Sequence, residues 1–214
     1  MDDIKKDPFE EYIRQSEPTK RELGYAWYTA MGLQAVDGLD TSDYLKKQEL
    51  SLDLPFFTKQ RKIVLRLLGH SDPEDLGEYI ANGGYQGLMK ALTMKPEEVL
   101  EIIKKSCLRG RGGGGFPTGT KWEMLAKSPL VDGEKFMICN GDEGDPGAYM
   151  DSCILGGGSH AVLEGMMIGA YATGATSGWF YIRAEYPLAI QRMELAIKQA
   201  KRYGILGQIG RAHV

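Results

Sequence analysis

Five of the six residues from Gly110 to Gly115 are glycine, inside the run L-R-G-R-G-G-G-G-F-P-T-G-T-K-W at 108–122. Glycine accepts positive φ angles and has no Cβ atom, so such a loop can present backbone N–H groups to a large anionic ligand. The aromatic Phe116 argues against a flexible linker, since linkers of that kind favour serine. Lys121 adds a positive charge for a phosphate. This run therefore predicts a loop that binds a nucleotide-like ligand.

The loop fits neither of the two common glycine-rich motifs. Gly110, Gly112 and Gly115 satisfy G-x-G-x-x-G, but that fingerprint should leave a strand, whereas a helical pattern over 95–105 precedes this loop. A Walker sequence is excluded too, because a threonine separates the last glycine from the lysine. The spacing alone thus leaves the type of nucleotide site open.

A second cluster of polar residues, N-G-D-E-G-D-P-G at 140–147, directly follows a predicted strand. We call it the acidic bend. The carboxyl end of a strand in an open α/β sheet is the usual place for a ligand. Since carboxylates repel phosphate, Asp142, Glu143 and Asp145 are expected to meet ribityl or ribose hydroxyls. A metal ion and a solvated acidic turn are the two alternatives.

Hydrophobic periodicity predicts an α/β fold with a Rossmann-like, partial parallel sheet and flanking helices, preceded by a helical N-terminal segment. Short apolar runs predict strands over 135–140, which we expect to be buried, and over 179–183, with Trp179 and Phe180 in the core. Gly165 and Gly169 are expected to let the helix over 160–172 pack closely. Further helices are predicted over 20–33, 62–68, 75–81, 84–92, 95–105, 121–127 and 187–203.

Composition excludes several classes of protein. The 214 residues carry a net charge of −3 and 43% hydrophobic residues, enough for a core and without the basic patch of a nucleic-acid-binding protein. No apolar run approaches the roughly 20 residues of a membrane span, and the N-terminus lacks the apolar core of a secretory signal. The three cysteines form no C-x-x-C pair. We therefore expect a soluble, cytoplasmic protein.

Other candidate residues favour structural roles. His160 opens a predicted helix and is expected to cap or pack rather than catalyse. Cys107 and Cys139 have no histidine nearby in sequence, so we expect buried, unreactive thiols. Arg183 and Glu185 end a predicted strand, where an ion pair is favoured over a ligand contact.

Three segments together resemble one protein family. They are the glycine run at 110–122, C-N-G-D-E-G-D-P-G-A-Y-M-D at 139–151 and Y-I-R-A-E-Y-P at 181–187. The family is the flavin-bearing, NADH-binding subunit of respiratory complex I, with relatives in NAD(P)-linked and electron-bifurcating hydrogenases and NAD-linked formate dehydrogenases. The match runs from about residue 55 to 207. The four-glycine loop and D-E-G-D-P-G are more similar to the hydrogenase-type relatives.

The resemblance implies FMN and NAD(H) as cofactors. It places the glycines and Phe116 along the flavin and nicotinamide pocket, Lys121 on the FMN, and Asp145 near the nicotinamide end. It also implies that the side chains at 140, 142 and 143 hold the polar side of the flavin. The predicted cofactor-binding residues are Gly110, Arg111, Gly112, Gly113, Gly115, Phe116, Lys121, Asn140, Asp142, Glu143 and Asp145.

Other parts of the chain depart from the family pattern. The second flavin-contacting segment, Y-x-C-G-E-E, a ubiquitin-like domain and the C-x-x-C-x-x-C motif for a 4Fe-4S cluster do not follow. Residues 156–159, G-G-G-S, replace a more acidic, proline-containing turn. We therefore expect three parts: a foreign helical segment at 1–50, the N-terminal half of an FMN/NADH-binding domain at 51–207, and a non-family tail at 208–214.

The segment at 17–45 resembles, less specifically, the opening helices of Fic-type proteins with their antitoxin-like helix, but the catalytic H-P-F-x-x-G-N motif is absent. A chimeric reading frame is favoured over a genuine fusion. The function expected from the resemblance is hydride transfer from NADH to FMN and onward electron transfer to iron–sulfur carriers, beside hydrogenase-type or complex I-type subunits. The alternative is a non-catalytic chimeric remnant or a toxin–antitoxin-type regulatory module.

Overall fold

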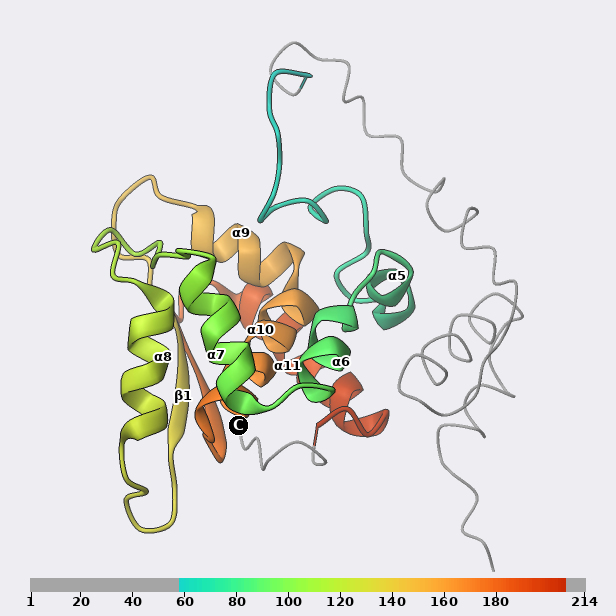
Figure 1. Cartoon of the computed structure of the whole chain (residues 1–214). Helices are drawn as coiled ribbons and strands as arrows, with labels where there is room; N and C mark the ends of the chain where they lie inside the picture. Colours follow the sequence, from blue (N-terminus) through green and yellow to red (C-terminus); the bar gives the residue numbers. More distant parts are fainter. Residues whose placement is uncertain (1–57, 207–214) are drawn as a thin grey trace, which may run out of the picture.

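The computed structural model describes residues 58–206, so the predicted segments at 1–50 and 208–214 lie outside the described residues. Seven helices and two strands occur in this part of the chain (Figure 1). In order they are α5 (Leu76–Ala81), α6 (Gln86–Leu92), α7 (Pro96–Lys105), α8 (Thr118–Lys127), β1 (Phe136–Gly141), α9 (Met150–Gly157), α10 (Ser159–Thr173), β2 (Ser177–Ile182) and α11 (Pro187–Arg202).

The two strands pair in parallel, with Ile138 opposite Trp179 and Asn140 opposite Tyr181. A parallel pair needs a crossover connection, and α9 and α10 provide it. The predicted α/β class with a partial parallel sheet is therefore confirmed, and both strands lie within one or two residues of their predicted positions.

Helix α10 is the central element of the described structure and contacts all the other helices and both strands (Figure 1). One of its two glycines explains the close packing: a Cβ atom at Gly169 would lie 3.0 Å from both Met137 Cε and Trp122 Cζ2. Gly165 was expected to do the same, but this is wrong, since a Cβ atom there would meet no heavy atom within 4 Å. Gly169, and not Gly165, is therefore the position where α8 and β1 approach α10 closely.

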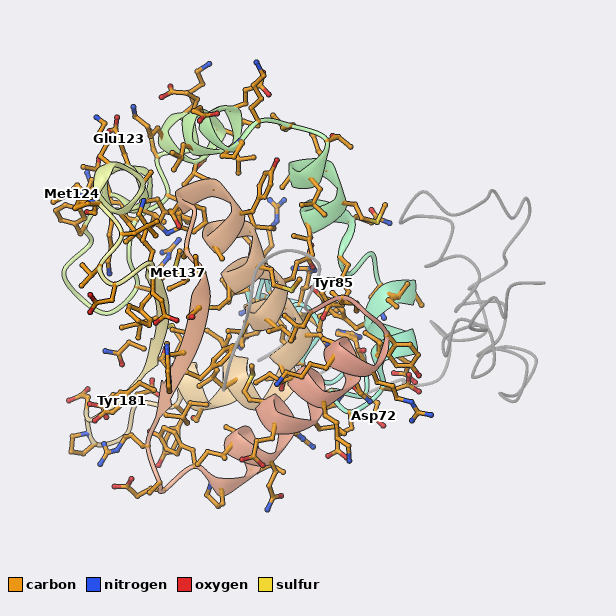
Figure 2. All side chains as sticks on the ribbon, turned by 90° about the horizontal axis from the view of Figure 1, so that it is seen from below. Asp72, Tyr85, Glu123, Met124, Met137 and Tyr181 are labelled. Atoms are coloured by element: carbon orange, nitrogen blue, oxygen red, sulfur yellow. The ribbon has the colours of Figure 1, made fainter. Side chains whose placement is uncertain are left out.

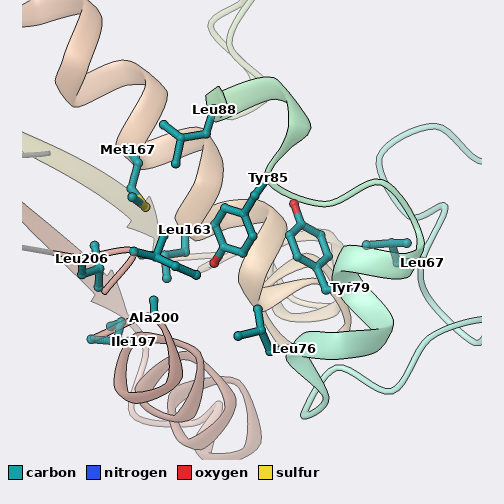
Figure 3. Close-up of a cluster of buried hydrophobic side chains, with 11 residues drawn as sticks. Leu67, Leu76, Tyr79, Tyr85, Leu88, Leu163, Met167, Ile197, Ala200 and Leu206 are labelled. Atoms are coloured by element: carbon teal, nitrogen blue, oxygen red, sulfur yellow. The ribbon is translucent and has the colours of Figure 1, made fainter. Parts of the chain in front are cut away.

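The largest hydrophobic cluster lies between α5, α6, α10 and the end of α11 (Figure 3). Tyr85 and Leu88, almost without solvent exposure, face Leu163 and Met167 of α10. The cluster consists of Leu67, Leu76, Tyr79, Tyr85, Leu88, Leu163, Met167, Ile197, Ala200, Ile205 and Leu206. It attaches the helices that precede the glycine loop to the crossover helix.

A buried carboxylate organises the polar groups of this cluster. Glu164 of α10 accepts hydrogen bonds from the Tyr85 N–H at 2.8 Å, the Leu88 N–H at 3.0 Å and the Tyr79 hydroxyl. Tyr85 has a left-handed φ of 61° and provides no side-chain cap for α6. A negative charge at a helix N-terminus is favourable, so Glu164 caps α6 from another helix. Burial, followed by this charge, raises the pKa of both tyrosines far above the ordinary range.

His160, 2% exposed, extends the same network. Its Nδ1 lies 2.9 Å from the Tyr85 hydroxyl and its Nε2 lies 2.7 Å from Gln199 Oε1. Because the amide oxygen only accepts, Nε2 carries the proton and Nδ1 accepts from the tyrosine in the neutral ring. The expectation that His160 packs is confirmed.

One predicted helix, at 62–68, is absent from the described residues, and one helix, at 150–157, was not predicted. The first segment forms turns rather than a helix, with hydrogen bonds such as Leu68 N–H to Leu65 O at 3.1 Å. The second is helix α9, which the glycines at 156–158 concealed. A Cβ atom at Gly157 would lie 2.3 Å from Leu68 Cδ1, so the glycine allows the turn segment to cross α9. A tertiary contact explains both differences.

The helices within residues 58–206 cover one face of the sheet and leave the other exposed (Figure 2). Met137, Cys139 and Phe180 face the helices, whereas Tyr181 points away from them. The expected burial of Trp179 is wrong, since it is 48% exposed, and β1 likewise is half exposed rather than buried. The sequence did not reveal this alternation of exposed and half-buried side chains, because both strands carry apolar residues on the outer face as well as on the face that packs against the helices.

Replacement of Glu164 by alanine is expected to lower the free energy of unfolding by about 3 kcal/mol, because two backbone N–H groups and a hydroxyl lose their buried acceptor. Urea unfolding measures the change. The matched control is Glu194→Ala on the exposed side of α11, which should alter stability by less than about 0.5 kcal/mol. Equal effects of the two substitutions would contradict the capping role.

The pH dependence of stability should reflect His160. Burial lowers its pKa below the ordinary 6.5, against the opposing effects of Gln199 and Asp75. The unfolded chain then takes up a proton first as the pH falls below about 6.5, so stability is present above that pH and is lost on acidification. Melting temperatures at pH 7.5 and 5.5 should differ more for the parent protein than for His160→Gln. The same change of melting temperature with pH in both proteins would contradict the assignment of this effect to His160.

Candidate functional site

The glycine loop connects α7 to α8, and two backbone hydrogen bonds join its two ends. Gly110 N–H donates to Phe116 O and Thr118 N–H donates to Leu108 O, both at 2.9 Å. Two glycines inside it require their residue type, since Gly113 has φ of 96° and Gly115 has φ of 60°. The glycine-rich sequence therefore forms a defined turn on a fixed base.

The tip of this loop is bare. In the described part of the chain, the backbone N–H groups from 111 to 115 donate no hydrogen bond, and Cβ atoms at Gly112 and Gly113 would meet nothing within 4 Å. Phe116 is 52% exposed, which leaves an aromatic ring beside the free amides. Free N–H donors suit phosphate oxygens, and an exposed ring suits stacking.

Helix α8 follows the loop and carries Lys121 in its second turn. Among residues 58–206 this lysine is exposed and forms no salt bridge, whereas Lys127 in the last turn pairs with Glu123 at 2.8 Å. Gly119 has a structural role, because a Cβ atom there would lie 2.7 Å from Lys104 Cα of α7. The contact between α7 and α8 thus fixes the helix that presents the lysine.

The acidic bend begins where β1 ends. Asn140 Oδ1 accepts from the Asp142 N–H at 2.8 Å, which turns the chain sharply after the strand. The carboxylate of Glu143 then accepts from three backbone N–H groups at the start of α9, those of Met150 (2.7 Å), Asp151 (3.1 Å) and Ser152 (3.3 Å). Glu143 therefore caps α9, a role that the sequence did not reveal.

These contacts perturb the ionisation of neighbouring groups. Partial loss of hydration opposes ionisation of Glu143, but the N–H donors of α9 outweigh it and hold the pKa of this carboxyl below its ordinary value. Burial, and then the charge of Asp151, raises the pKa of Cys139 to about 11, which leaves this thiol protonated. Cys139 is half-buried, whereas Cys107 is exposed, contrary to expectation.

The segment after β2 holds the bend from the other side. Arg183 Nη1 donates to Glu143 O at 2.9 Å, and the Tyr186 hydroxyl donates to the same oxygen at 3.0 Å. The predicted ion pair of Arg183 with Glu185 is confirmed at 2.8 Å. Sequence reasoning missed the contacts with the bend, because they join a side chain to a backbone oxygen 40 residues away.

The two predicted groups of site residues lie at one end of the α8–β1 pair (Figure 1). The glycine loop enters α8, the chain returns along β1, and the acidic bend leaves that strand at the same end. Across residues 58–206, no three His, Cys, Asp or Glu side chains gather where they could hold a metal ion.

The geometry describes a glycine loop with free backbone N–H groups and a polar bend at one end of an α/β domain. The family model for the Nuo51 FMN-binding domain matches residues 103–213, slightly more than half of the chain. The chain belongs to this family, as the glycine run and the acidic bend predict.

Several curated proteins are similar over the same region. HndC, from the NADP-reducing hydrogenase of Solidesulfovibrio fructosivorans, is 55% identical over 150 residues, 70% of this chain and 30% of HndC. The F component of the NADH-quinone oxidoreductase of Aquifex aeolicus is 46% identical over 133 residues, 62% of this chain and 30% of that protein. The chain thus spans about a third of the length of these relatives, and the expected similarity to hydrogenase-type proteins agrees with the higher identity.

The chain is also similar to part of a solved hydrogenase structure. The H2-reduced state of an NAD+-reducing [NiFe]-hydrogenase matches with a TM-score of 0.53 and 30% identity, over 72% of this chain and 24% of that chain. Its air-oxidised state, at 22% identity and a TM-score of 0.53, shows the similarity of fold alone. None of the helices within 58–206 combines the length and the apolar character that crossing a membrane requires.

Replacement of Glu143 by alanine should loosen the first turn of α9, because three N–H groups lose their acceptor. Hydrogen–deuterium exchange of residues 150–152 in the protein without added ligand is expected to accelerate, with a small fall in melting temperature. Asp145→Ala removes a nearby exposed carboxylate and serves as the control. If exchange in α9 is the same in both variants, the capping role is wrong.

Proposed function

We propose that this chain is the FMN-binding part of a flavoprotein subunit that oxidises NADH or NADPH. The observation that carries the proposal is the bare glycine loop, whose free N–H groups, exposed phenylalanine and nearby exposed lysine stand at the same end as the acidic bend. FMN combines a phosphate, a ribityl chain with hydroxyls and a planar ring. The glycine loop suits the phosphate and the ring, and the acidic bend suits the hydroxyls.

The loop is the proposed site for the phosphate and the ring. The amides at Gly112 and Gly113 can donate to phosphate oxygens, and Lys121 can approach them from α8. Phe116 offers an aromatic face for a flavin or nicotinamide ring. Gly110, Arg111 and Gly115 complete the proposed cradle.

The acidic bend is the proposed site for the hydroxyl groups. Asp142 and Asp145 are exposed, and their carboxylates can accept hydrogen bonds from ribityl or ribose hydroxyls. Asn140 Oδ1 and Glu143 Oε1 each accept one hydrogen bond within the protein and retain a further lone pair, whereas Glu143 Oε2 already accepts two. Glu143 thus has two roles in this proposal, as the cap of α9 and as a neighbour of the flavin.

Bound FMN would supply the redox chemistry, which is hydride acceptance from NAD(P)H and release of single electrons to iron–sulfur carriers. The protein's contribution is to hold the reacting rings in line, which requires no proton-transferring side chain. The names of the relatives, an NADP-reducing hydrogenase and an NADH-quinone oxidoreductase, support either nicotinamide nucleotide and partners of hydrogenase or complex I type.

Titration of the purified chain with FMN, followed by quenching of flavin fluorescence, tests the proposal. Saturable binding is expected, and Phe116→Ala and Lys121→Ala should each weaken it about tenfold, the size expected for loss of one stacking or charged contact. Lys127→Ala, at the other end of the same helix, is the matched control and should bind as the parent does.

A second measurement examines the redox reaction. The FMN-loaded chain should lose its visible flavin absorbance when NADH or NADPH is added without oxygen. A protein that remains colourless and binds no FMN would contradict the proposal and favour the non-catalytic alternative. Equal FMN affinity in Lys121→Ala and Lys127→Ala would exclude the assigned pocket.

A further inference from the structure

We propose that Arg183 is the positioning residue of the acidic bend: it ties the bend to the carboxyl end of β2 and thereby determines where Asp142 and Asp145 lie. The proposal deepens the function proposed above and rests on it where FMN is concerned. The position of the bend itself can be measured without any cofactor.

The guanidinium group of Arg183 contacts three groups in different directions. Nη1 donates to Glu143 O at 2.9 Å, Nη2 pairs with Glu185 Oε1 at 2.8 Å, and Nε lies 3.8 Å from Asp142 Oδ1. Only a planar, multiply donating group can do this, and a lysine ammonium on its flexible stem cannot reproduce the arrangement. The bend is thus attached through its backbone as well as through a carboxylate.

Both the backbone and the side chain of Glu143 are consequently held by hydrogen bonds. Its carbonyl oxygen receives donors from Arg183 and Tyr186, while its carboxylate accepts from the first turn of α9. These contacts connect the bend to the segment after β2 and to the crossover helix. Since the two strands are parallel, their carboxyl ends meet at the same edge, which brings these partners within reach.

The rest of the bend has few other attachments. Over residues 144–148, one backbone hydrogen bond, from Ala148 N–H to Asp145 O at 3.1 Å, is present within the described residues. Gly144 passes directly beside the arginine, where a Cβ atom would lie 3.5 Å from Nη1. The location of Asp145 therefore depends on the fixed point at Glu143, which Arg183 holds together with Tyr186 and the first turn of α9.

The contribution of Arg183 should be local. Its side chain and that of Glu185 are partly exposed, so solvent weakens the attraction between their charges. Loss of the guanidinium should release the bend and leave the core of the protein intact. This separates a positioning role from a general stabilising one.

The test uses the whole chain with Arg183→Gln, Arg183→Lys and Tyr186→Phe, and Glu185→Gln as the matched control. Hydrogen–deuterium exchange without FMN should accelerate several-fold at 150–152 in Arg183→Gln, with a melting temperature close to that of the parent. FMN affinity should fall about tenfold, the size expected for one misplaced charged contact. Arg183→Lys should recover only part of both effects, Tyr186→Phe should show a smaller loss, and Glu185→Gln should match the parent.

The outcomes are distinguishable. Unchanged exchange at 150–152 in Arg183→Gln overturns the positioning role. Full recovery of exchange and affinity by Arg183→Lys also overturns it, since charge alone would then suffice. If the parent chain binds no FMN while Arg183→Gln still accelerates exchange, the function proposed above fails and the positioning of the bend by Arg183 stands.

Discussion

Parallel pairing of β1 with β2 is the constraint on which the rest of the structure depends. Parallel strands require a crossover, and here α9 and α10 form it, with α10 as the helix that all others contact. The same pairing brings the acidic bend and the Arg183 segment to one edge of the sheet. The position of the candidate site and the position of the core therefore have one common origin.

Charged side chains fix two helix ends and the acidic bend. Glu164 caps α6 inside the protein, and Glu143 caps α9 near its surface. Both carboxylates accept N–H groups of helices to which they do not belong. In this fold, acidic side chains thus attach helix ends to the sheet and its crossover, and Arg183 attaches the acidic bend itself. This explains why a segment with so many carboxylates has a defined conformation.

Much of the fold could be predicted from periodicity, since six of the seven helices and both strands lie near their expected positions. Helix α9 was missed because its glycines match a turn pattern, and only the tertiary structure, in which Leu68 crosses Gly157, explains the glycine at that position. The exposed position of Trp179 was missed because a short apolar run does not reveal which face of a strand is covered. The division of the chain into three parts and the ligand contacts of the site residues remain predictions.

The sequence by itself determined the family and the chemistry that the site can offer. Consecutive glycines provide accessible backbone N–H groups, a lysine provides a positive charge, and clustered carboxylates provide hydrogen-bond acceptors, and these properties belong to the residue types wherever they are placed. Tertiary structure alone decided how these groups are held. Glu143 is a helix cap, Gly119 and Gly169 are points of close contact, and Arg183 is the partner of a distant carbonyl. Each of these roles depends on atoms brought together from separate parts of the chain, and local sequence does not encode that proximity.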